Sequence, residues 1–418
     1  MEMVIYALII CAIIIGTPIF SIMILLSASA FYFAGIDLSA IGVEVYKMAS
    51  APTILTIPLF TFAGYVMAES KSPERLLKLA QVSLGWMPGG VAIVSLVICA
   101  FFTAFTGASG VTIIALGGLI YPMLINEKYD EDFSLGLITT SGSLGLLFPP
   151  SLPIILYGIV ARVDIDQLFL AGLIPGIILI LILTFYSIYK GQVVKREPFI
   201  FSEFILALKG ARYELPLPFL VIGGIYSGLV TPTEASAICA AYVVLMVCFL
   251  YKEIDLFKDL PAIVHKSMSL VGAILMILCC ALAMTNYLVD EEVPTKLLEY
   301  MKTLIENKYL FLLFLNVFLL IVGSMMDIFS AIIVVVPLIL PIAEEFGINP
   351  LHLAIIFLTN LEIGYITPPV GINLFISSFR FDKSVLYLYR VAVPFLILLI
   401  IALLIITYIP WLSLLWFD

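Results

Sequence analysis

Helix-breaking residues recur in this chain at one constant spacing. Five prolines and glycines each have an identical partner 219 positions later: Pro122, Gly145, Pro149, Pro150 and Pro175 match Pro341, Gly364, Pro368, Pro369 and Pro394. Because the spacing is constant, the two halves align over these positions without a gap. Helix breakers at equivalent places in two apolar halves are typical of transporters built from structural repeats, whose binding site lies at the breaks.

The composition sets the class of protein. Of the 418 residues, 63% are hydrophobic and 12% are charged, which is more apolar than a soluble core requires and indicates a polytopic membrane protein. No GxxxxGK[ST] loop is present, so energy from nucleotide hydrolysis is not expected. The six cysteines lie in apolar runs without a CxxC pair, which argues against a zinc site. No basic patch predicts binding to nucleic acid.

Two apolar segments, 88–125 and 309–343, are too long for one membrane crossing and have polar centres at 103–110 and 323–330. Unpaired backbone in hydrocarbon costs several kcal/mol per group, so such centres persist only inside protein or along a cavity. We therefore predict two re-entrant hairpins. A long tilted helix is the alternative for each segment.

The segments that follow, 133–160 and 351–379, are long enough to cross once, and each contains a proline pair. Proline removes an amide donor and disfavours a helical residue before it, so carbonyl oxygens become free at membrane depth. We predict one broken helix in each half, with a tight kink as the alternative.

Charge placement predicts the orientation. The loop 190–212 is the most basic and is expected to be cytoplasmic. Counting crossings from it, hairpin 88–125 opens to the cytoplasm and hairpin 309–343 opens to the outside. The halves are then inverted. Ten crossings with external termini follow if residues 3–34 form two helices, whereas one helix there places the N-terminus inside.

The predicted fold class is an all-α polytopic membrane protein with two inverted repeats that each hold a re-entrant hairpin and a broken helix. The amphipathic stretches 71–87 and 291–308 are read as interfacial arm helices. The predicted divisions are a first repeat over 1–190 (arm 71–87, hairpin 88–125, broken helix 133–160), a linker over 191–213 and a second repeat over 214–418 (arm 291–308, hairpin 309–343, broken helix 351–379).

Hydroxyl groups and freed carbonyls are hard oxygen ligands that suit an alkali cation. We call the polar centres of the hairpins, 103–110 and 323–330, their tips, and the interruptions at the proline pairs the breaks of the broken helices. One predicted cation site combines the first tip with the first break, and a second site combines the second tip with the second break. A substrate lies between the two sites. For any single serine or threonine, a hydrogen bond back to its own helix is the alternative. The predicted binding residues are Thr106, Gly107, Ser109, Ser141, Ser143, Gly145 and Pro149 in the first half, and Ser324, Asp327, Ser330, Gly364, Thr367 and Pro369 in the second.

Asp327 stands out because a carboxylate at mid-membrane costs about 2.5–3.5 kcal/mol and needs a partner. A cation or a proton would serve, and a shallower position paired with neighbouring backbone is the alternative. Glu362, also in an apolar run, is a second such candidate. Glu234 is read as an interfacial loop residue.

The sequence Gly107–Gly110 also matches GxSG, the nucleophile motif of rhomboid-type intramembrane proteases. That chemistry needs a histidine to accept the serine proton. The two histidines, His265 and His352, both lie near membrane boundaries, so a protease is the less favoured reading and an enzyme is not expected.

The run Phe105–Val111, the segment Gly145–Ser151 and the later segment Gly364–Asn373 together resemble the large membrane subunit, DctM type, of tripartite ATP-independent periplasmic (TRAP) transporters. The resemblance extends over essentially the whole chain. It implies the ion-transporter fold, with inverted repeats, opposed hairpins and elevator-like movement of a transport domain against a scaffold. It further implies Na⁺-driven uptake of a small organic acid that a periplasmic binding protein delivers. The bacterial cytoplasmic membrane is the implied location.

The resemblance also implies a separate small four-helix membrane subunit as partner and no cofactor apart from the coupling ion. We expect Na⁺ at Ser109, Gly145, Asp327 and Thr367. A stand-alone Na⁺/dicarboxylate symporter of the same fold and an ion channel remain as alternatives.

Overall fold

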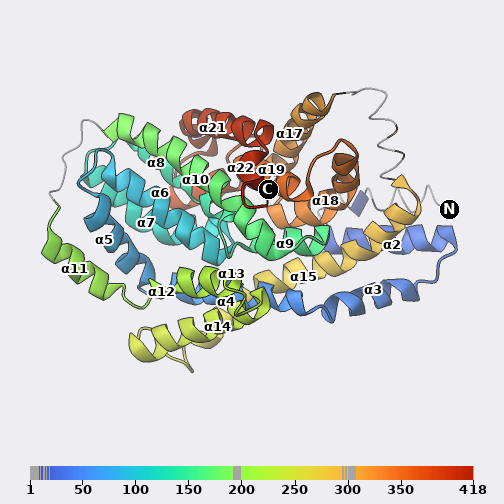
Figure 1. Ribbon diagram of the computed structural model, residues 1–418, viewed down its shortest axis with the longest axis horizontal. Helices are drawn as coiled ribbons and strands as arrows, with labels where there is room; N and C mark the ends of the chain where they lie inside the picture. The colour runs from blue at the N-terminus through green and yellow to red at the C-terminus, as the bar shows by residue number, and fades with distance from the viewer. Residues whose placement is uncertain are drawn as a thin grey trace.

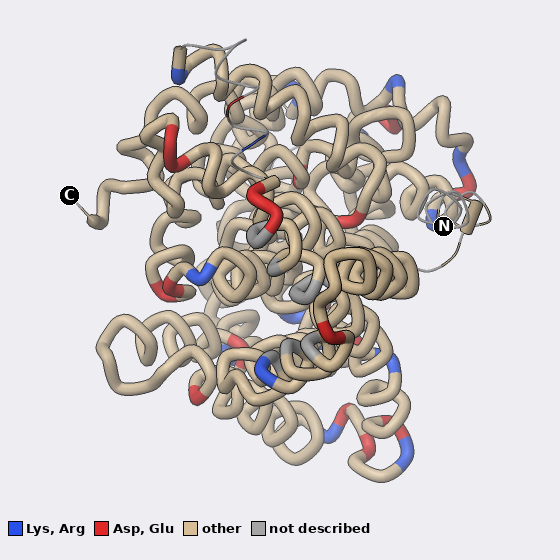
Figure 2. Tube along the Cα trace, turned by 90° about the vertical axis from the view of Figure 1, so that its right-hand side faces the viewer, with Lys and Arg blue, Asp and Glu red and all other residues tan. Residues whose placement is uncertain are grey.

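The computed structural model describes residues 19–191, 199–293 and 307–417, together with residues 9, 11, 12, 15, 17, 296 and 299. Every regular element in these ranges is a helix, which confirms the predicted all-α class. Seven of the described helices are long and apolar enough to cross a membrane, or up to nine when each bent pair counts as one span. Lysine, arginine, aspartate and glutamate form short, separated patches on an otherwise uncharged chain (Figure 2).

Helices from both halves of the sequence build one layer along the lower edge of the molecule (Figure 1). α4 (Thr56–Glu69) packs against α14 (Pro232–Val244) and against α15 (Leu260–Asp290). α15 also contacts α2 (Ile19–Ala34) and α3 (Ser39–Ala49). The short helices α12 (Pro216–Pro218), η4 (Phe219–Gly223) and α13 (Gly224–Tyr226) lie in the same layer.

The upper body holds the two hairpins and the two broken helices (Figure 1). The long helices α10 (Ile165–Lys190) and α21 (Val385–Tyr408) pack against each other beside them. In the first half the elements are α6 (Gly90–Thr106), α7 (Ser109–Asn126), α8 (Glu131–Ser141), η2 (Leu144–Leu147) and α9 (Leu152–Ala161); in the second they are α17 (Lys308–Met325), α18 (Ile328–Glu345), α19 (Pro350–Gly364) and α20 (Ile372–Phe381).

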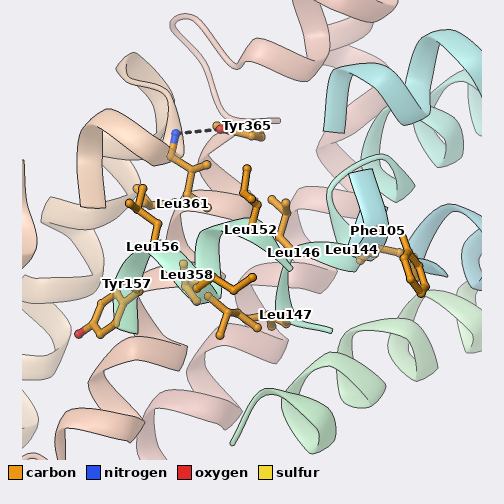
Figure 3. Packing of buried hydrophobic residues seen from close by; sticks show 14 of the residues in the cluster. Phe105, Leu144, Leu146, Leu147, Leu152, Leu156, Tyr157, Leu358, Leu361 and Tyr365 are labelled. Carbon is orange, nitrogen blue, oxygen red and sulfur yellow. Dashed lines mark hydrogen bonds between the residues drawn. The ribbon is translucent and has the colours of Figure 1, made fainter. Parts of the chain in front are cut away.

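The two halves share one buried core. α18 of the second half packs on α9 of the first, and α19 contacts both η2 and α9. Leu147 and Leu156 of the first half lie with Leu358 and Leu361 of the second in this core (Figure 3). Burial of these apolar side chains against one another fixes the broken helices as one unit, since packed interiors do not deform continuously.

The arm helix of the first half is α5 (Ser72–Leu84). Its Arg75 pairs with Glu214 at 2.6 Å and with Glu253, and its guanidinium lies 3.8 Å from the centre of the Tyr251 ring. These contacts tie α5 to the segments on either side of the α12–α14 region of the lower layer. The predicted second arm, 291–308, lies almost wholly outside the described residues, as do most of residues 1–18 and residues 192–198 of the predicted linker.

α15 begins within a polar stretch of the sequence. Residues 254–266 are polar and amphipathic and precede a long apolar run, but the helix already begins at Leu260. Pro261 is compatible with this start, because the first turn of a helix has no intrahelical partner for its amides. The polar residues therefore extend the helix rather than interrupt it.

Candidate functional site

The first hairpin turns at Gly107, which separates α6 from α7. Gly107 has a φ of +64°, a left-handed conformation that favours glycine, and a Cβ there would lie 2.4 Å from Cβ of Leu152. α7 begins at Ser109 after Ala108, and no side chain caps it. Its first amides therefore have no partner within the helix.

The first broken helix packs directly against this hairpin. After α8 the chain passes through η2 and a cis Pro149–Pro150 bond before α9 begins, and the two parts are bent by 43°. A Cβ on Gly145 would lie 2.1 Å from the carbonyl oxygen of Ala100, so only glycine allows η2 to approach α6 this closely.

A threonine that the sequence analysis did not single out links the two elements. The Thr103 hydroxyl lies 2.7 Å from the carbonyl oxygen of Gly142 and 2.8 Å from Oγ1 of Thr112. All three residues are buried. Thr103 and Thr112 are nine residues apart across the turn. Thr103 begins the polar centre 103–110 and Thr112 closely follows it, and this position in the sequence could have identified both threonines.

Several predicted hydroxyl ligands of the first half bond to their own helix. Ser141 donates to the carbonyl of Ile138 at 3.2 Å and Ser143 to that of Thr140 at 3.3 Å. Thr106 donates to the Ala108 carbonyl at 3.4 Å. The bonds of Ser141 and Ser143 are those that the alternative reading described, whereas Thr106 donates forward into the turn between α6 and α7. Their oxygens keep lone pairs with which to accept a second interaction.

Asp327 ends the second hairpin turn and caps α18. Its Oδ1 accepts from the amides of Phe329 and Ser330, each at 3.0 Å, and its Oδ2 accepts from the Ser330 hydroxyl. The carboxylate is thus paired with neighbouring backbone, as the alternative reading had it, and it offsets the positive end of α18.

The second break joins the second tip through backbone contacts. The hydroxyl of Tyr365 accepts from the amide of Ile328 at 2.8 Å (Figure 3), and the amide of Gly371 donates to the carbonyl of Ser324 at 3.1 Å. A Cβ on Gly364 would lie 2.4 Å from the carbonyl carbon of Gly323. α19 and α17 therefore touch at two glycines.

The remaining predicted residues of the second break lie nearer the surface. Thr367 is half-buried and donates to the carbonyl of Ile363 at 2.8 Å. Pro368 and Pro369, joined by a cis bond, are exposed, and the Pro369 carbonyl accepts from the Tyr389 hydroxyl. Ser324, by contrast, belongs to the second hairpin tip, is buried and donates to the Ile321 carbonyl at 2.8 Å.

Glu362 is fully buried on α19, and neither of its carboxylate oxygens has a hydrogen-bond partner among the described residues. An isolated buried carboxylate is costly, so this group needs a proton or a bound cation. Glu234 has no such need, because it forms a capping box with Thr231 at the exposed start of α14.

A cavity of about 480 Å³ lies between the two hairpin tips. Both tips contribute to it, and helices of the lower layer close its other side, so it lies where the two bodies of the molecule meet. The lining includes Gly107–Val111 and Ile114 of the first hairpin, Asp327–Phe329 of the second, Leu146, Tyr365, Ile372 and Ile376 of the breaks and α20, and Tyr65, Leu270, Ala273, Ile274 and Ile277 of α4 and α15.

Of the predicted site residues, Gly107, Ser109 and Asp327 line this cavity. The other ten, Thr106, Ser141, Ser143, Gly145, Pro149, Ser324, Ser330, Gly364, Thr367 and Pro369, do not line it, and they lie in the tips and breaks around it. The sequence did not single out Tyr65, Tyr365 or α15, because contacts from distant segments leave no local signal.

The electrostatics of the cavity come from helix ends. α7 and α20 begin at its wall without a side-chain cap, although in the first turn of α20 the amide of Asn373 donates to the Tyr365 carbonyl at 3.0 Å. The start of α7 therefore presents the stronger partial positive charge, whereas Asp327 neutralises the start of α18. No histidine is among the lining residues, so Ser109 lacks the base that a serine protease requires. His352 instead contacts Ser413 at 3.2 Å and the Thr407 carbonyl at 3.1 Å.

Comparison with known proteins agrees with this arrangement. The profile of the family described as "Tripartite ATP-independent periplasmic transporter, DctM component" matches residues 5–412. The C4-dicarboxylate TRAP transporter large permease protein DctM of Vibrio cholerae is 32% identical over 433 residues, covering 98% of this chain and 95% of that protein. The isethionate TRAP transporter permease protein DctMQ of Oleidesulfovibrio alaskensis is 36% identical over 364 residues, covering 85% of this chain. This chain spans 57% of the length of that relative.

Among solved structures, the YdaH transporter of Alcanivorax borkumensis superimposes with a TM-score of 0.62 at 15% identity, covering 91% of this chain and 89% of its own. That likeness concerns the fold. The profile match over nearly the entire sequence and the similarity to large permease proteins establish that the chain is not an enzyme but a multi-pass protein of the bacterial inner membrane and belongs to the DctM family, the large permease subunits of TRAP transporters.

Proposed function

We propose that this chain forms the translocation pathway for Na⁺-coupled uptake of a small organic acid. The observation that carries the proposal is the cavity between the hairpin tips, where α7 and α20 start without a side-chain cap. Helix N-termini favour anions, and half-helices at membrane depth are where secondary transporters bind anionic groups. The relatives named for C4-dicarboxylate and isethionate are consistent with an anionic substrate.

Na⁺ binds in this proposal at the oxygen-rich junctions of tip and break. In the first half, Ser109 begins α7 and Gly145 seats η2 against α6. In the second half, Asp327 and Thr367 flank the contact between Gly323 and Gly364. Hydroxyl, carboxylate and carbonyl oxygens are the ligands that hard cations prefer. Ion binding then holds tip to break, and so completes the wall of the substrate cavity.

Alternating access is proposed to be elevator-like. The cavity has one wall from the hairpin body and another from α4 and α15 of the lower layer. Movement of the hairpin body against the lower layer would expose the cavity to one side and then to the other, while the shared core keeps tips and breaks together.

Two partners belong to the proposal: a separate small four-helix membrane subunit and a periplasmic binding protein that delivers the acid. The test is uptake of labelled succinate or isethionate into proteoliposomes that contain the chain and its small subunit, with the cognate binding protein outside. We expect uptake with an inward Na⁺ gradient and none when K⁺ replaces Na⁺. Equal uptake in K⁺ would contradict the coupling.

The alternatives give different results in the same vesicles. A stand-alone Na⁺/dicarboxylate symporter would take up succinate without the binding protein or the small subunit. An ion channel would pass a Na⁺ current that does not depend on substrate. Uptake that requires all three components supports the tripartite assignment.

A further inference from the structure

The cavity contains no lysine, arginine or histidine among its lining residues, although the proposed substrate is an anion. The helix N-termini favour an anion at the tips, but an acid that leaves toward the cytoplasm moves away from them. A positive side chain beyond the apolar part of the wall would lower the cost of that step. We therefore followed the lining helices away from the tips.

The contact between α7 and α20 extends from the cavity to an arginine. α20 packs along α7, and both helices contribute residues to the wall. A Cβ on Gly110 would lie 2.6 Å from Ile376, and one turn further along α20 the Nε of Arg380 donates to the carbonyl of Ile114 at 3.1 Å. Ile114 and Ile376 both line the cavity, so Arg380 lies at the next turn outward.

Gly118 makes room for the guanidinium. A Cβ on Gly118 would lie 2.0 Å from Nη2 of Arg380, so any larger residue on α7 would displace the arginine. From Ser109 to Gly118 α7 rises about 13.5 Å, which places Arg380 well below the tip and toward the side to which the first hairpin is predicted to open. The Nε contact leaves both Nη groups free to donate.

Lys383 and Asp132 each have a partner of their own, and neither partner is Arg380. Lys383 pairs with Glu131 at 2.6 Å, and the Tyr387 hydroxyl donates to Asp132. Across the cavity, Lys266 follows the same pattern and pairs with Glu69 at 2.7 Å. Arg380 is exposed and has no carboxylate partner among the described residues.

The geometry points to Arg380 as an anion-binding residue at the cytoplasmic end of the cavity, where its free Nη groups take the carboxylate or sulfonate of the transported acid as it leaves the hairpin tips. A guanidinium matches both groups, because it donates two parallel hydrogen bonds to a pair of oxygens. This inference rests on the proposed function, since it assumes that the cavity carries an organic anion.

The test uses the complete transporter in proteoliposomes and compares Arg380→Gln with Arg380→Lys. Loss of a charge-assisted hydrogen bond should raise the KM for succinate or isethionate on the cytoplasmic face, measured by exchange, about tenfold or more. Arg380→Lys should recover much of the affinity. The KM for Na⁺ should stay at the wild-type value in both variants. Lys266→Gln is the matched control, because its charge is already neutralised by Glu69.

Gly118→Ala tests the geometry without removing the charge. Its methyl group displaces the flexible end of Arg380, so it should reproduce the raised cytoplasmic KM of Arg380→Gln while Arg380 is still present. A wild-type KM in Arg380→Gln overturns the inference. A defect that disappears in vesicles of phosphatidylcholine alone also overturns it, because the arginine then serves an anionic lipid headgroup.

These outcomes are separable from those of the proposed function. If wild-type vesicles transport succinate or isethionate with Na⁺ and Arg380→Gln does so with equal KM on both faces, only the role of Arg380 fails. If wild-type vesicles show no dependence on Na⁺, the proposed coupling fails, and the exchange KM still reports on Arg380.

Discussion

The two helix breaks occupy equivalent places in the sequence but meet different surroundings. Pro149 and Pro150 are buried, whereas Pro368 and Pro369 are exposed. In the first break, η2 packs against α6, α10 and α19, and these helices enclose it. The comparison shows that a repeated backbone signal specifies where a helix ends and does not specify what covers the end.

The hairpin tips differ in charge at equivalent positions. Asp327 caps α18, and its counterpart 219 residues earlier is Ala108, which leaves α7 without a side-chain cap. One side of the cavity therefore presents neutralised amides and the other presents amides free to meet an anion. The inverted repeats thus give a cavity with two chemically distinct sides.

The second repeat also contains a buried polar chain that the first lacks. Asn316 lies 3.1 Å from Thr407 and 2.7 Å from Asn360, and the carbonyl of Thr407 contacts His352. The counterparts of Asn316, Thr407 and His352 are Val97, Ile188 and Phe133. This chain joins α17, α19 and α21 by hydrogen bonds where the first repeat relies on apolar packing.

The largest expected effect concerns the feature that the two repeats share. Gly145→Ala and Gly364→Ala each place a methyl group within 2.4 Å of backbone atoms in the hairpin helix. Because backbone cannot move aside cheaply, we expect each variant to lose roughly 3 kcal/mol of stability or to fail to fold. Thermal unfolding of the purified protein measures this. Gly272→Ala in α15 is the control, since nothing lies within 4 Å of its Cβ position.

Adding a side-chain cap to α7 would remove the difference between the two hairpin tips. Ala108 has extended backbone (φ −134°, ψ 110°), which suits an N-cap. Ala108→Asp should therefore place a carboxylate on the amides of α7, and we expect anion uptake to fall by about two orders of magnitude, since like charge then meets the substrate. The stability should be unchanged or slightly higher. Ala108→Asn is the neutral control, and normal uptake in Ala108→Asp would argue against an anion at this tip.

Removing the existing cap probes the other tip. Asp327→Ala should cost about 1 kcal/mol of stability through the lost cap. It should also raise the Na⁺ concentration for half-maximal uptake about tenfold, through the lost charged ligand. Asp327→Asn keeps a capping oxygen and loses the charge, so it should show the Na⁺ effect without the full loss of stability. If the Na⁺ dependence stays normal in both variants, Asp327 is a cap and not a ligand.

The smallest expected effect belongs to Ser109. Ser109→Ala removes one neutral oxygen from the first tip and should raise the Na⁺ requirement for uptake about threefold, with little change in stability. Titrating Na⁺ in the uptake assay measures it. Ser95→Ala serves for comparison, because that buried hydroxyl donates to the Val91 carbonyl within α6 at 2.7 Å and belongs to no proposed site. Wild-type Na⁺ dependence in Ser109→Ala would remove this serine from the proposed site.

Local chemistry made much of this protein predictable. Apolar length predicted helices, proline pairs predicted the breaks, and the glycine-rich tip at residue 107 predicted a turn, because each signal acts on the backbone within a few residues. The constant spacing of 219 residues then predicted two related halves.

Other features depended on the way distant segments pack. The sequence left open whether Asp327 would bind a cation or pair with neighbouring backbone, and it did not indicate that the first proline pair would be buried and the second exposed. It also gave no sign that Tyr65 and α15 would complete the cavity, or that Gly118 would seat Arg380 beside Ile114. Helix breaks are determined by nearby residues, because backbone sterics act over a few residues. A cavity and its charges, in contrast, arise only when segments hundreds of residues apart come into contact.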